Sequence, residues 1–180
     1  MAGRLIAVVG PSGVGKDSVM ATLKARRPAL HLVRRVITRD PEAGGEEFTP
    51  VNEGRFEKMA AAGAFALWWR AHGLAYGIPV AVRDVLGEGR DALVNLSRGV
   101  LLEAVERFPG LLVLALHARP EVLADRLAAR GREDRDAIAA RLAQADKPLP
   151  EGVPHLRLDN SGPLEQTVEA ALAMLYPERV

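Results

Sequence analysis

The sequence predicts an α/β fold in which helices cover both faces of a parallel sheet. Short apolar runs, which are typical of buried strands, alternate along the chain with longer segments of helical periodicity. The first apolar run, residues 5–9, leads directly into a glycine-rich turn and a helical segment at residues 18–25. A chain of 180 residues with 48% hydrophobic content is large enough to build a good core in one domain.

The glycine-rich turn nearly matches a phosphate-binding loop, or P-loop, whose pattern is Gly, four residues, Gly-Lys and then Ser or Thr. Glycines at positions 10, 13 and 15 allow backbone N–H groups to converge on phosphate oxygens at the start of a helix. The alternative is a glycine-rich turn with an incidental lysine, which the flanking strand and helix disfavour. We therefore predict that a nucleoside triphosphate binds these residues: Gly10, Pro11, Ser12, Gly13, Val14, Gly15, Lys16, Asp17 and Ser18.

Asp17 is the one departure from the P-loop pattern, because it stands where a hydroxyl normally binds Mg²⁺. A carboxylate is a charged oxygen ligand that can reach the metal directly or through water. Asp17 is equally able to cap the following helix and favour its positive end, and Ser18 would then supply the hydroxyl one position late. The sequence predicts Mg²⁺ beside Asp17 or Ser18 and leaves this choice open.

The rest of the chain continues the alternation of strands and helices. Strands are expected at residues 92–96, 111–116 and 155–158, and helices at residues 100–108, 120–129, 134–145 and 164–175. Residues 38–80 break the rhythm with a short helical stretch near 53–62 and an aromatic run at 65–69 that is compatible with a strand. We expect this segment to be an insertion at the carboxyl ends of the sheet strands, where α/β proteins bind ligands.

Composition narrows the classes of partner. The net charge of +1 does not indicate a basic surface that would bind nucleic acid or an anionic membrane. The absence of cysteine excludes disulfides, thiolate metal sites and a cysteine nucleophile. The first strand begins near residue 5, which leaves no room for a signal peptide, and no apolar run approaches the length of a membrane span. We expect a cytoplasmic protein that acts on a small molecule.

Motifs along nearly the whole chain resemble the guanylate-kinase-like family of P-loop kinases. In the insertion the resemblance rests on Thr38-Arg39, Pro41, Gly44, Glu46, Phe65, Trp68, Gly73 and Tyr76-Gly77. Downstream, residues 119–123, Arg126-Leu127, residues 130–133, Ile138 and Arg141-Leu142 resemble the lid of that family. The resemblance implies a nucleoside-monophosphate-kinase-like sheet with an acceptor-binding insert and an arginine-bearing lid. Within the single domain 1–180 it implies a core at 1–37 and 81–118, an insert at 38–80, a lid region at 119–146 and a C-terminal core strand and helix at 147–180.

Departures from the guanylate-kinase pattern indicate a different acceptor. Leu67 stands where that family has the glutamate that binds guanine, Phe48 replaces a phosphate-binding tyrosine, and Glu42 stands where an arginine is expected. Loss of the polar partner of guanine costs discrimination on the order of 10⁴-fold. Residues 15–18, 43–46, 63–69 and 71–79 instead resemble the ribose 1,5-bisphosphate phosphokinase family. That family uses ATP to phosphorylate the 1-phosphate of ribose 1,5-bisphosphate, giving 5-phosphoribosyl 1-diphosphate (PRPP) in phosphonate breakdown.

The implied reaction assigns roles to the charged residues. A phosphate acceptor is already anionic at neutral pH, so the protein must align the reactants and neutralise charge, with Mg²⁺ and ATP as cofactors, rather than supply a base. We expect Lys16, Arg130 and Arg141 to be catalytic, the two arginines closing with the lid over the transferring phosphoryl group. Arg132 is as consistent with an exposed ion pair to Asp136 as with a role in the lid.

Five residues are expected at the acceptor. Arg35 and Arg39 precede the insert and would clamp phosphates with paired N–H groups. His72 and Tyr76 lie on the presumed acceptor loop, although His72 is equally an ordinary loop histidine, and Arg98 follows the strand at 92–96.

Three further features complete the expectations for the site. The strand end at 92–96 offers only Asn95 and Ser97 where P-loop enzymes place a metal-side acid. The resemblance implies that the loop at Asn160 passes the adenine of the nucleotide. Trp68 and Trp69 are expected to pack beneath the acceptor rather than to stack on it.

Three alternative functions remain beside the favoured one. Guanylate kinase is disfavoured by Leu67 and Phe48, and a gluconokinase-type kinase needs a carboxylate base for which no well-placed residue is found. A non-catalytic guanylate-kinase-like binding module can dispense with the P-loop lysine and the lid arginines, which this chain retains at Lys16, Arg130 and Arg141. A homodimer is compatible with the sequence.

Overall fold

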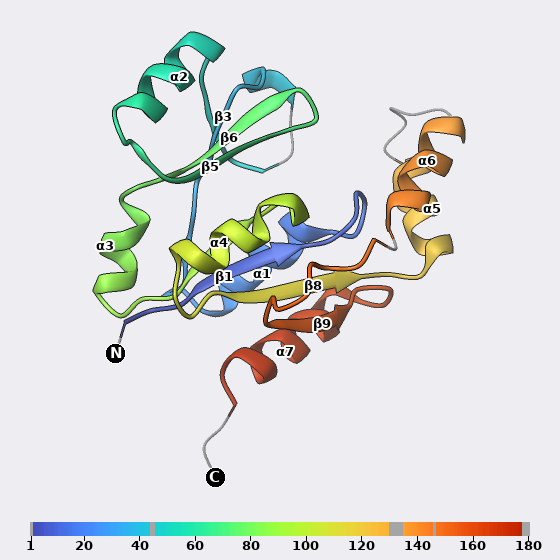
Figure 1. The fold of residues 1–180 in the computed structure, drawn as a ribbon. Helices are drawn as coiled ribbons and strands as arrows, with labels where there is room; N and C mark the ends of the chain where they lie inside the picture. Colours follow the sequence, from blue (N-terminus) through green and yellow to red (C-terminus); the bar gives the residue numbers. More distant parts are fainter. Residues whose placement is uncertain (1, 44–45, 130–134, 146, 178–180) are drawn as a thin grey trace.

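A five-stranded parallel sheet forms the centre of the molecule (Figure 1). The structure, a computed structural model, describes residues 2–43, 46–129, 135–145 and 147–177. The strands follow the order β2 (His31–Leu32), β7 (Ala92–Asn95), β1 (Leu5–Val9), β8 (Leu112–His117) and β9 (His155–Asp159), each parallel to its neighbours. All five residues of β1 are buried, which explains its continuous apolar run.

Helices cover both faces of this sheet. On one face α1 (Lys16–Arg26) and α7 (Leu164–Leu175) pack against Ile6 and Val8 of β1. On the other face α3 (Val82–Gly87) and α4 (Leu101–Arg107) pack against Leu5, Ala7 and Val9. The predicted α/β fold is therefore confirmed.

A second, four-stranded sheet lies above the central one in Figure 1. Its strands follow the order β4 (Thr49–Pro50), β3 (Val36–Ile37), β6 (Leu74–Pro79) and β5 (Phe65–Ala71), with a 3₁₀ turn at Pro41–Ala43. On its outer face α2 (Glu53–Ala61) covers a small cluster that includes Phe56 and Phe65. On its inner face Leu67, Trp69 and Ile78 join the core of the central sheet. This sheet is the structure of the segment that interrupts the strand–helix alternation.

Two helices, α5 (Pro120–Ala129) and α6 (Arg135–Ala145), stand together beyond the carboxyl end of β8 (Figure 1). The α5 bounds match the predicted helix, as do those of α7. The α1 helix begins at Lys16, two residues before the predicted start, because Gly15 has a left-handed backbone and serves as the N-cap. Strand β6 and helix α3 were not predicted, because residues 74–87 are mostly apolar without a clear period and are interrupted by Gly77 and Pro79.

The amino ends of the central strands are tied to the end of α7. The Arg4 guanidinium donates to Asp91, and the Tyr176 hydroxyl donates to Asp91 Oδ2 over 2.8 Å. Burial alone would raise the pKa of Asp91, but the hydrogen bonds from Arg4 and Tyr176 outweigh it, so the pKa lies below its usual value. Burial, together with the hydrogen bond to Asp91, raises the pKa of Tyr176 to about 12.

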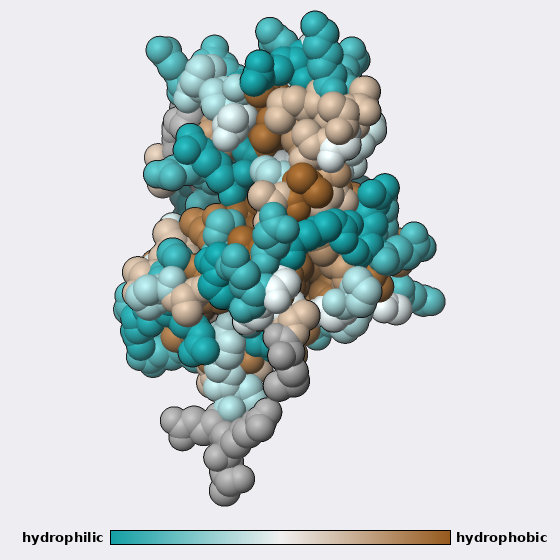
Figure 2. Space-filling view, turned by 90° about the vertical axis from the view of Figure 1, so that its left-hand side faces the viewer, coloured by the Kyte–Doolittle hydropathy of each residue, from teal (hydrophilic) through white to brown (hydrophobic). Residues whose placement is uncertain are grey.

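The side of the molecule that carries α2 and α3 is mostly hydrophilic (Figure 2). Exposed large hydrophobic residues in the described ranges are scattered along the chain: Leu32, Trp68, Val80, Leu102 and Met174. None of the described helices is long and apolar enough to cross a membrane.

Candidate active site

The P-loop connects the carboxyl end of β1 to the first turn of α1. Gly13 and Gly15 have φ values of 82° and 94°, in the left-handed region that glycine adopts without strain. At Gly10 a Cβ atom would lie 2.7 Å from the carbonyl oxygen of Leu116, so the chain passes too close to β8 for any side chain. These glycines allow the tight curl that the sequence pattern requires.

Lys16 and Arg141 meet at this loop. The Lys16 ammonium donates to the carbonyl oxygens of Gly10, at 2.9 Å, and Pro11, at 3.2 Å. From α6 the Arg141 guanidinium donates to the Ser12 hydroxyl over 2.7 Å. The structure thus brings two of the three residues expected to be catalytic to the same loop, whereas Arg130, like Arg132, lies outside the described residues.

Asp17 and Ser18 lie on the exposed first turn of α1. The N-cap of the helix is Gly15, and no side chain makes a capping hydrogen bond there, so Asp17 is not the cap. It does lie in the first turn, where a carboxylate favours the positive end of the helix, as the same alternative expected. Among the described residues no group of three or more His, Cys, Asp or Glu side chains is placed to hold a metal. One carboxylate and one hydroxyl beside a P-loop fit Mg²⁺, which keeps several waters and takes other ligands from substrate phosphates.

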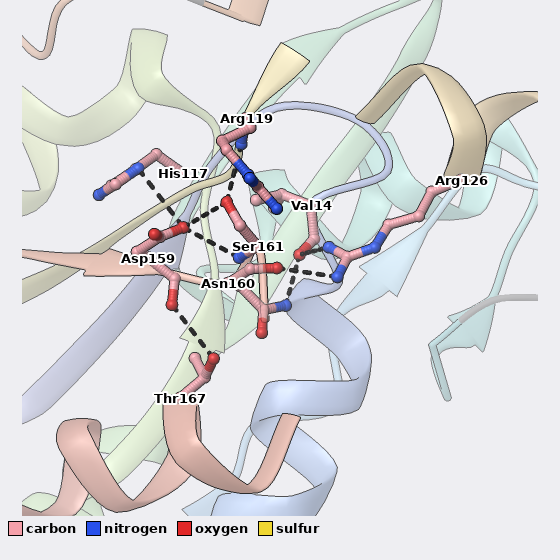
Figure 3. Close-up of polar contacts among 8 residues, drawn as sticks. All are labelled: Val14, His117, Arg119, Arg126, Asp159, Asn160, Ser161 and Thr167. Carbon is pink, nitrogen blue, oxygen red and sulfur yellow. Dashed lines mark hydrogen bonds and ion pairs between the residues drawn. The ribbon is translucent and has the colours of Figure 1, made fainter. Parts of the chain in front are cut away.

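Asn160 lies beneath the P-loop, in the turn that follows β9 (Figure 3). Its side chain is buried, and its amide nitrogen donates to the Val14 carbonyl oxygen over 2.7 Å. The neighbouring turn is held by Ser161, whose hydroxyl and backbone N–H both donate to Asp159 and keep the pKa of that carboxyl below its usual value. A cavity of about 350 Å³ adjoins the loop, lined by Gly13, Gly15, Ser18, Arg126, Ala129, Asn160 and Leu164.

The inner face of the second sheet holds a row of stacked side chains. The Tyr76 ring stacks on Trp69 with centroids 5.3 Å apart, and the Arg35 guanidinium lies 5.0 Å from the Tyr76 centroid. Arg35 is only 4% exposed and makes an ion pair with both carboxylate oxygens of Glu46. The Trp69 indole N–H donates to the Ser97 hydroxyl over 2.9 Å, which joins this row to the end of β7. The row therefore links the second sheet to the carboxyl end of β7, which is the strand next to β1 in the central sheet.

Arg39 lies on the segment that follows β3. Its guanidinium lies 4.4 Å from the ring centroid of Phe48, which is buried where the guanylate-kinase pattern has a tyrosine. His72 lies at the exposed tip of the β5–β6 hairpin with a φ of 52°. That value, with 73° at Gly73, is typical of a two-residue type I′ turn. Within the described part of the chain, His72 occupies a turn position and makes no hydrogen bond or ion pair with the other expected acceptor residues.

Arg98 holds the end of a helix. Its guanidinium donates to the carbonyl oxygens of Gln144, Ala145 and Lys147, at 3.2, 2.9 and 2.8 Å. These groups lie at the carboxyl end of α6, where backbone acceptors have no partner within the helix. A contact between Arg98 and an acceptor phosphate stays a prediction.

The aromatic residues of β5 divide between the two faces of the second sheet. Trp69 is buried on the inner face, as expected for packing, whereas Trp68 is 43% exposed and contacts Phe56 edge-on from the outer face. Leu67 is fully buried on the inner face and brings no polar group to it.

Three contributors to the site were missed in the sequence. Arg126 was noted only as part of the lid motif, yet it donates to the Val14 and Asn160 carbonyl oxygens. Glu46 was noted only for its spacing, and its pairing with Arg35 depends on how the loop folds back. Ser97 was considered as a metal-side residue and is instead the partner of Trp69. No sequence signal identifies these pairs, which are 11 to 112 residues apart.

Comparisons with known proteins agree on the fold and identify close relatives. The chain is 52% identical over 178 residues to "Ribose 1,5-bisphosphate phosphokinase PhnN" of Ruegeria sp., which covers 98% of this chain and 94% of that one. It is 50% identical over 177 residues to the protein of the same name from Azotobacter vinelandii, covering 97% of each. No family model matches the chain.

Two solved structures share the fold. Guanylate kinase from Anaplasma phagocytophilum superposes with a TM-score of 0.70 at 17% identity, over 97% of this chain and 84% of that one. A gluconokinase from Sinorhizobium meliloti gives a TM-score of 0.56 at 21% identity, over 97% and 91%. At these identities the likeness concerns the fold, and it confirms the predicted P-loop kinase architecture.

Proposed function

The chain belongs to the ribose 1,5-bisphosphate phosphokinase family, and from this premise we propose that it transfers the γ-phosphoryl group of ATP to the 1-phosphate of ribose 1,5-bisphosphate. The products are PRPP and ADP, and the reaction belongs to phosphonate catabolism. The observation that carries the proposal is the pairing of a P-loop with a second sheet whose inner side bears Arg35 and Tyr76. Such a pairing suits a nucleotide donor and an anionic acceptor.

The reaction needs little covalent chemistry from the protein. An oxygen of the acceptor phosphate forms a bond to the γ-phosphorus while the bond from that phosphorus to the β,γ-bridging oxygen breaks. The electron pair leaves with ADP. The acceptor phosphate is largely ionised at pH 7, since its second pKa is about 6, so no general base is required. This fits a site that presents lysine and arginine rather than a serine–histidine–acid set.

Each P-loop residue then has a role on the donor side. Backbone N–H groups of residues 12–18 surround the phosphates, and the Lys16 ammonium exchanges the Gly10 and Pro11 carbonyls for phosphate oxygens. Arg141, already at Ser12, turns to the transferring group. Mg²⁺ would be held by Asp17 or Ser18 and would neutralise charge on the β- and γ-phosphates. We place the adenine beside the turn that contains residue 160, where backbone groups of that turn would contact it.

On the acceptor side, Arg39 and Tyr76 are proposed to bind the phosphates and hydroxyls of the sugar, with Arg35, His72 and Arg98 as further candidates. The Arg39 guanidinium packs against the face of the Phe48 ring, and this contact helps to hold it in place. Leu67 offers an apolar, buried side chain where guanine would need a polar partner. This absence favours ribose 1,5-bisphosphate over GMP.

The test is to incubate the purified protein with Mg-ATP and, in parallel, ribose 1,5-bisphosphate, GMP or gluconate, and to measure product formation. We expect PRPP to form, with negligible turnover of GMP and gluconate. Fast phosphorylation of GMP or gluconate would instead favour the guanylate kinase or gluconokinase alternative. Failure of all three acceptors, with Mg-ATP bound, would favour a binding module. A cytoplasmic location and a homodimer stay predictions.

A further inference from the structure

One P-loop carbonyl group is held from outside the loop by two side chains. The Val14 carbonyl oxygen accepts a hydrogen bond from Asn160 Nδ2 over 2.7 Å and another from Arg126 Nη1 over 3.2 Å. The second arm of the same guanidinium, Nη2, donates to the Asn160 carbonyl oxygen over 2.8 Å. Figure 3 shows Arg126 and Asn160 converging on Val14. The three residues form a closed set of contacts, which we call the Val14 brace.

The brace also fixes the direction of an N–H group. The C=O and N–H of a trans peptide plane point in opposite directions, and the structure has no cis peptide bonds in the described ranges. Holding the Val14 carbonyl toward Asn160 therefore turns the Gly15 N–H away from Asn160. Within the described residues that N–H donates no hydrogen bond, so it is available to a phosphate oxygen. Gly15 is also the N-cap of α1, where the helix favours an anion.

Glycine at position 15 makes room for the brace. A Cβ atom on Gly15 would lie 2.8 Å from Asn160 Nδ2, too close for the amide to keep its place. Asn160 is itself held by its backbone N–H, which donates to the His117 carbonyl over 2.8 Å, and by Thr167, whose hydroxyl donates to the Asp159 carbonyl over 3.1 Å. The brace is therefore anchored to β8, β9 and α7.

We propose that Arg126 and Asn160 are positioning residues that set the Gly15 N–H of the P-loop for phosphate binding. This rests on the proposed function insofar as the loop must bind a triphosphate. It assigns the two residues a role that does not depend on the nucleotide base. Because Arg126 comes from α5 and Asn160 from the turn after β9, the loop takes its shape from segments more than a hundred residues away.

The competing role is direct contact with the base, since both residues also line the 350 Å³ cavity. Inorganic tripolyphosphate separates the two roles, because it carries the triphosphate chain without a base. The experiment measures the dissociation constants of Mg-ATP and Mg-tripolyphosphate by calorimetry for the wild-type protein and for two variants. Asn160→Asp removes the donor to Val14 with little change of shape, but it adds a carboxylate beside the phosphates, which weakens anion binding by itself. Arg126→Lys keeps the charge but cannot span two carbonyls, so it is the variant that tests the position of the N–H group.

We expect each variant to weaken both ligands by the same factor, about 10-fold to 100-fold for Asn160→Asp and about 5-fold to 10-fold for Arg126→Lys. Arg157→Gln, which removes an exposed arginine from β9, is the matched control and should leave both constants unchanged. The thermal midpoint of each unliganded variant shows whether it folds, and Arg126→Lys carries the test if Asn160→Asp does not.

Weakening of Mg-ATP with unchanged Mg-tripolyphosphate binding would overturn the proposal in favour of base contact. Unchanged binding of both ligands would overturn it as well. A wild-type protein that binds neither ligand would contradict the proposed function itself, an outcome distinct from either of these.

Discussion

The proposed donor side and the proposed acceptor side of the site are built in different ways. On the donor side, charged and polar side chains bind main-chain carbonyls: Lys16 binds Gly10 and Pro11, and Asn160 binds Val14. On the acceptor side, the buried row on the second sheet is built from side chains that contact one another, as Arg35 does with Glu46. The donor side therefore presents backbone N–H groups whose directions are set by the fold, whereas the acceptor side presents a surface of paired side chains.

The two halves of the site should therefore respond differently to mutation. A backbone-built site loses function when a charge or a peptide direction changes, with little effect on the folded state. A site made of a buried ion pair loses stability as well, because removal of one partner leaves the other charge buried without compensation. The predictions below test this contrast.

Lys16→Ala should have the largest effect. Loss of this charge from the phosphate site is expected to lower kcat/KM about 10³-fold, at the upper end of the range for removal of one preorganised donor. The thermal midpoint without ligand should stay the same, while the rise produced by Mg-ATP disappears. Lys58→Ala, on the exposed side of α2, is the control. Activity within about 10-fold of wild type would refute a donor role for Lys16.

Arg141→Ala should have the next largest effect, about 10²-fold on kcat. Arg141 is exposed and contacts the loop at Ser12. Its charge is therefore expected to stabilise the reaction only after the guanidinium has moved to the transferring phosphoryl group. Single-turnover kinetics at saturating Mg-ATP would measure this step. Gln144→Ala, also exposed on α6, should be neutral. A raised KM for ATP with unchanged kcat would assign Arg141 to binding instead.

Glu46→Gln should affect the acceptor side alone. It leaves the buried Arg35 charge without its carboxylate, which we expect to lower the free energy of unfolding by about 3 kcal/mol. The KM for the acceptor should rise, while the dissociation constant of Mg-ATP stays the same. The adjacent Glu47→Gln changes an exposed carboxylate and is the matched control. An equal weakening of acceptor binding and of Mg-ATP binding would mean that the two sides of the site are not independent.

Asp91→Asn should have the smallest effect, a change in stability that leaves substrate binding on both sides of the site unchanged. The pKa of Asp91 is lowered in the folded protein, so the unfolded chain binds more protons between the two pKa values and stability rises with pH across that window. The contribution is fully present above about pH 4, the usual value for Asp, and is lost as pH falls through the folded value. Urea unfolding from about pH 6 to about pH 2 measures it.

The magnitude expected for Asp91→Asn at pH 7 is about 1 kcal/mol, because the Arg4 side chain is 37% exposed and solvent screens the pair. The variant should show a flatter acid limb with unchanged kcat and KM. Asp84→Asn, an exposed carboxylate on α3, should keep the wild-type limb. A change in KM for either substrate would show that this distant cluster is coupled to the site.

Most of the fold could be predicted, because its signals are local. The strands β1, β7 and β8 are apolar runs and β9 is a weaker one, while α5 and α7 have regular periodicity with proline at or just before their starts. The two-residue strands β2, β3 and β4 could not be predicted, since a pair of residues carries no period. Strand β6 is recognised by its pairing with β3 and β5, and no local sequence pattern predicts that pairing.

The P-loop, its lysine and the kinase family can be recognised from the amino-acid sequence, because they depend on residues that are neighbours in the chain and on glycines at fixed spacing. Which side chains complete the site depends instead on how the chain folds. Asn160 reaches Val14 across 146 residues, Arg126 across 112, and Trp69 meets Ser97 across 28. Such contacts arise where parallel strands place their carboxyl ends at one edge of a sheet, and strand order is a property of the whole fold.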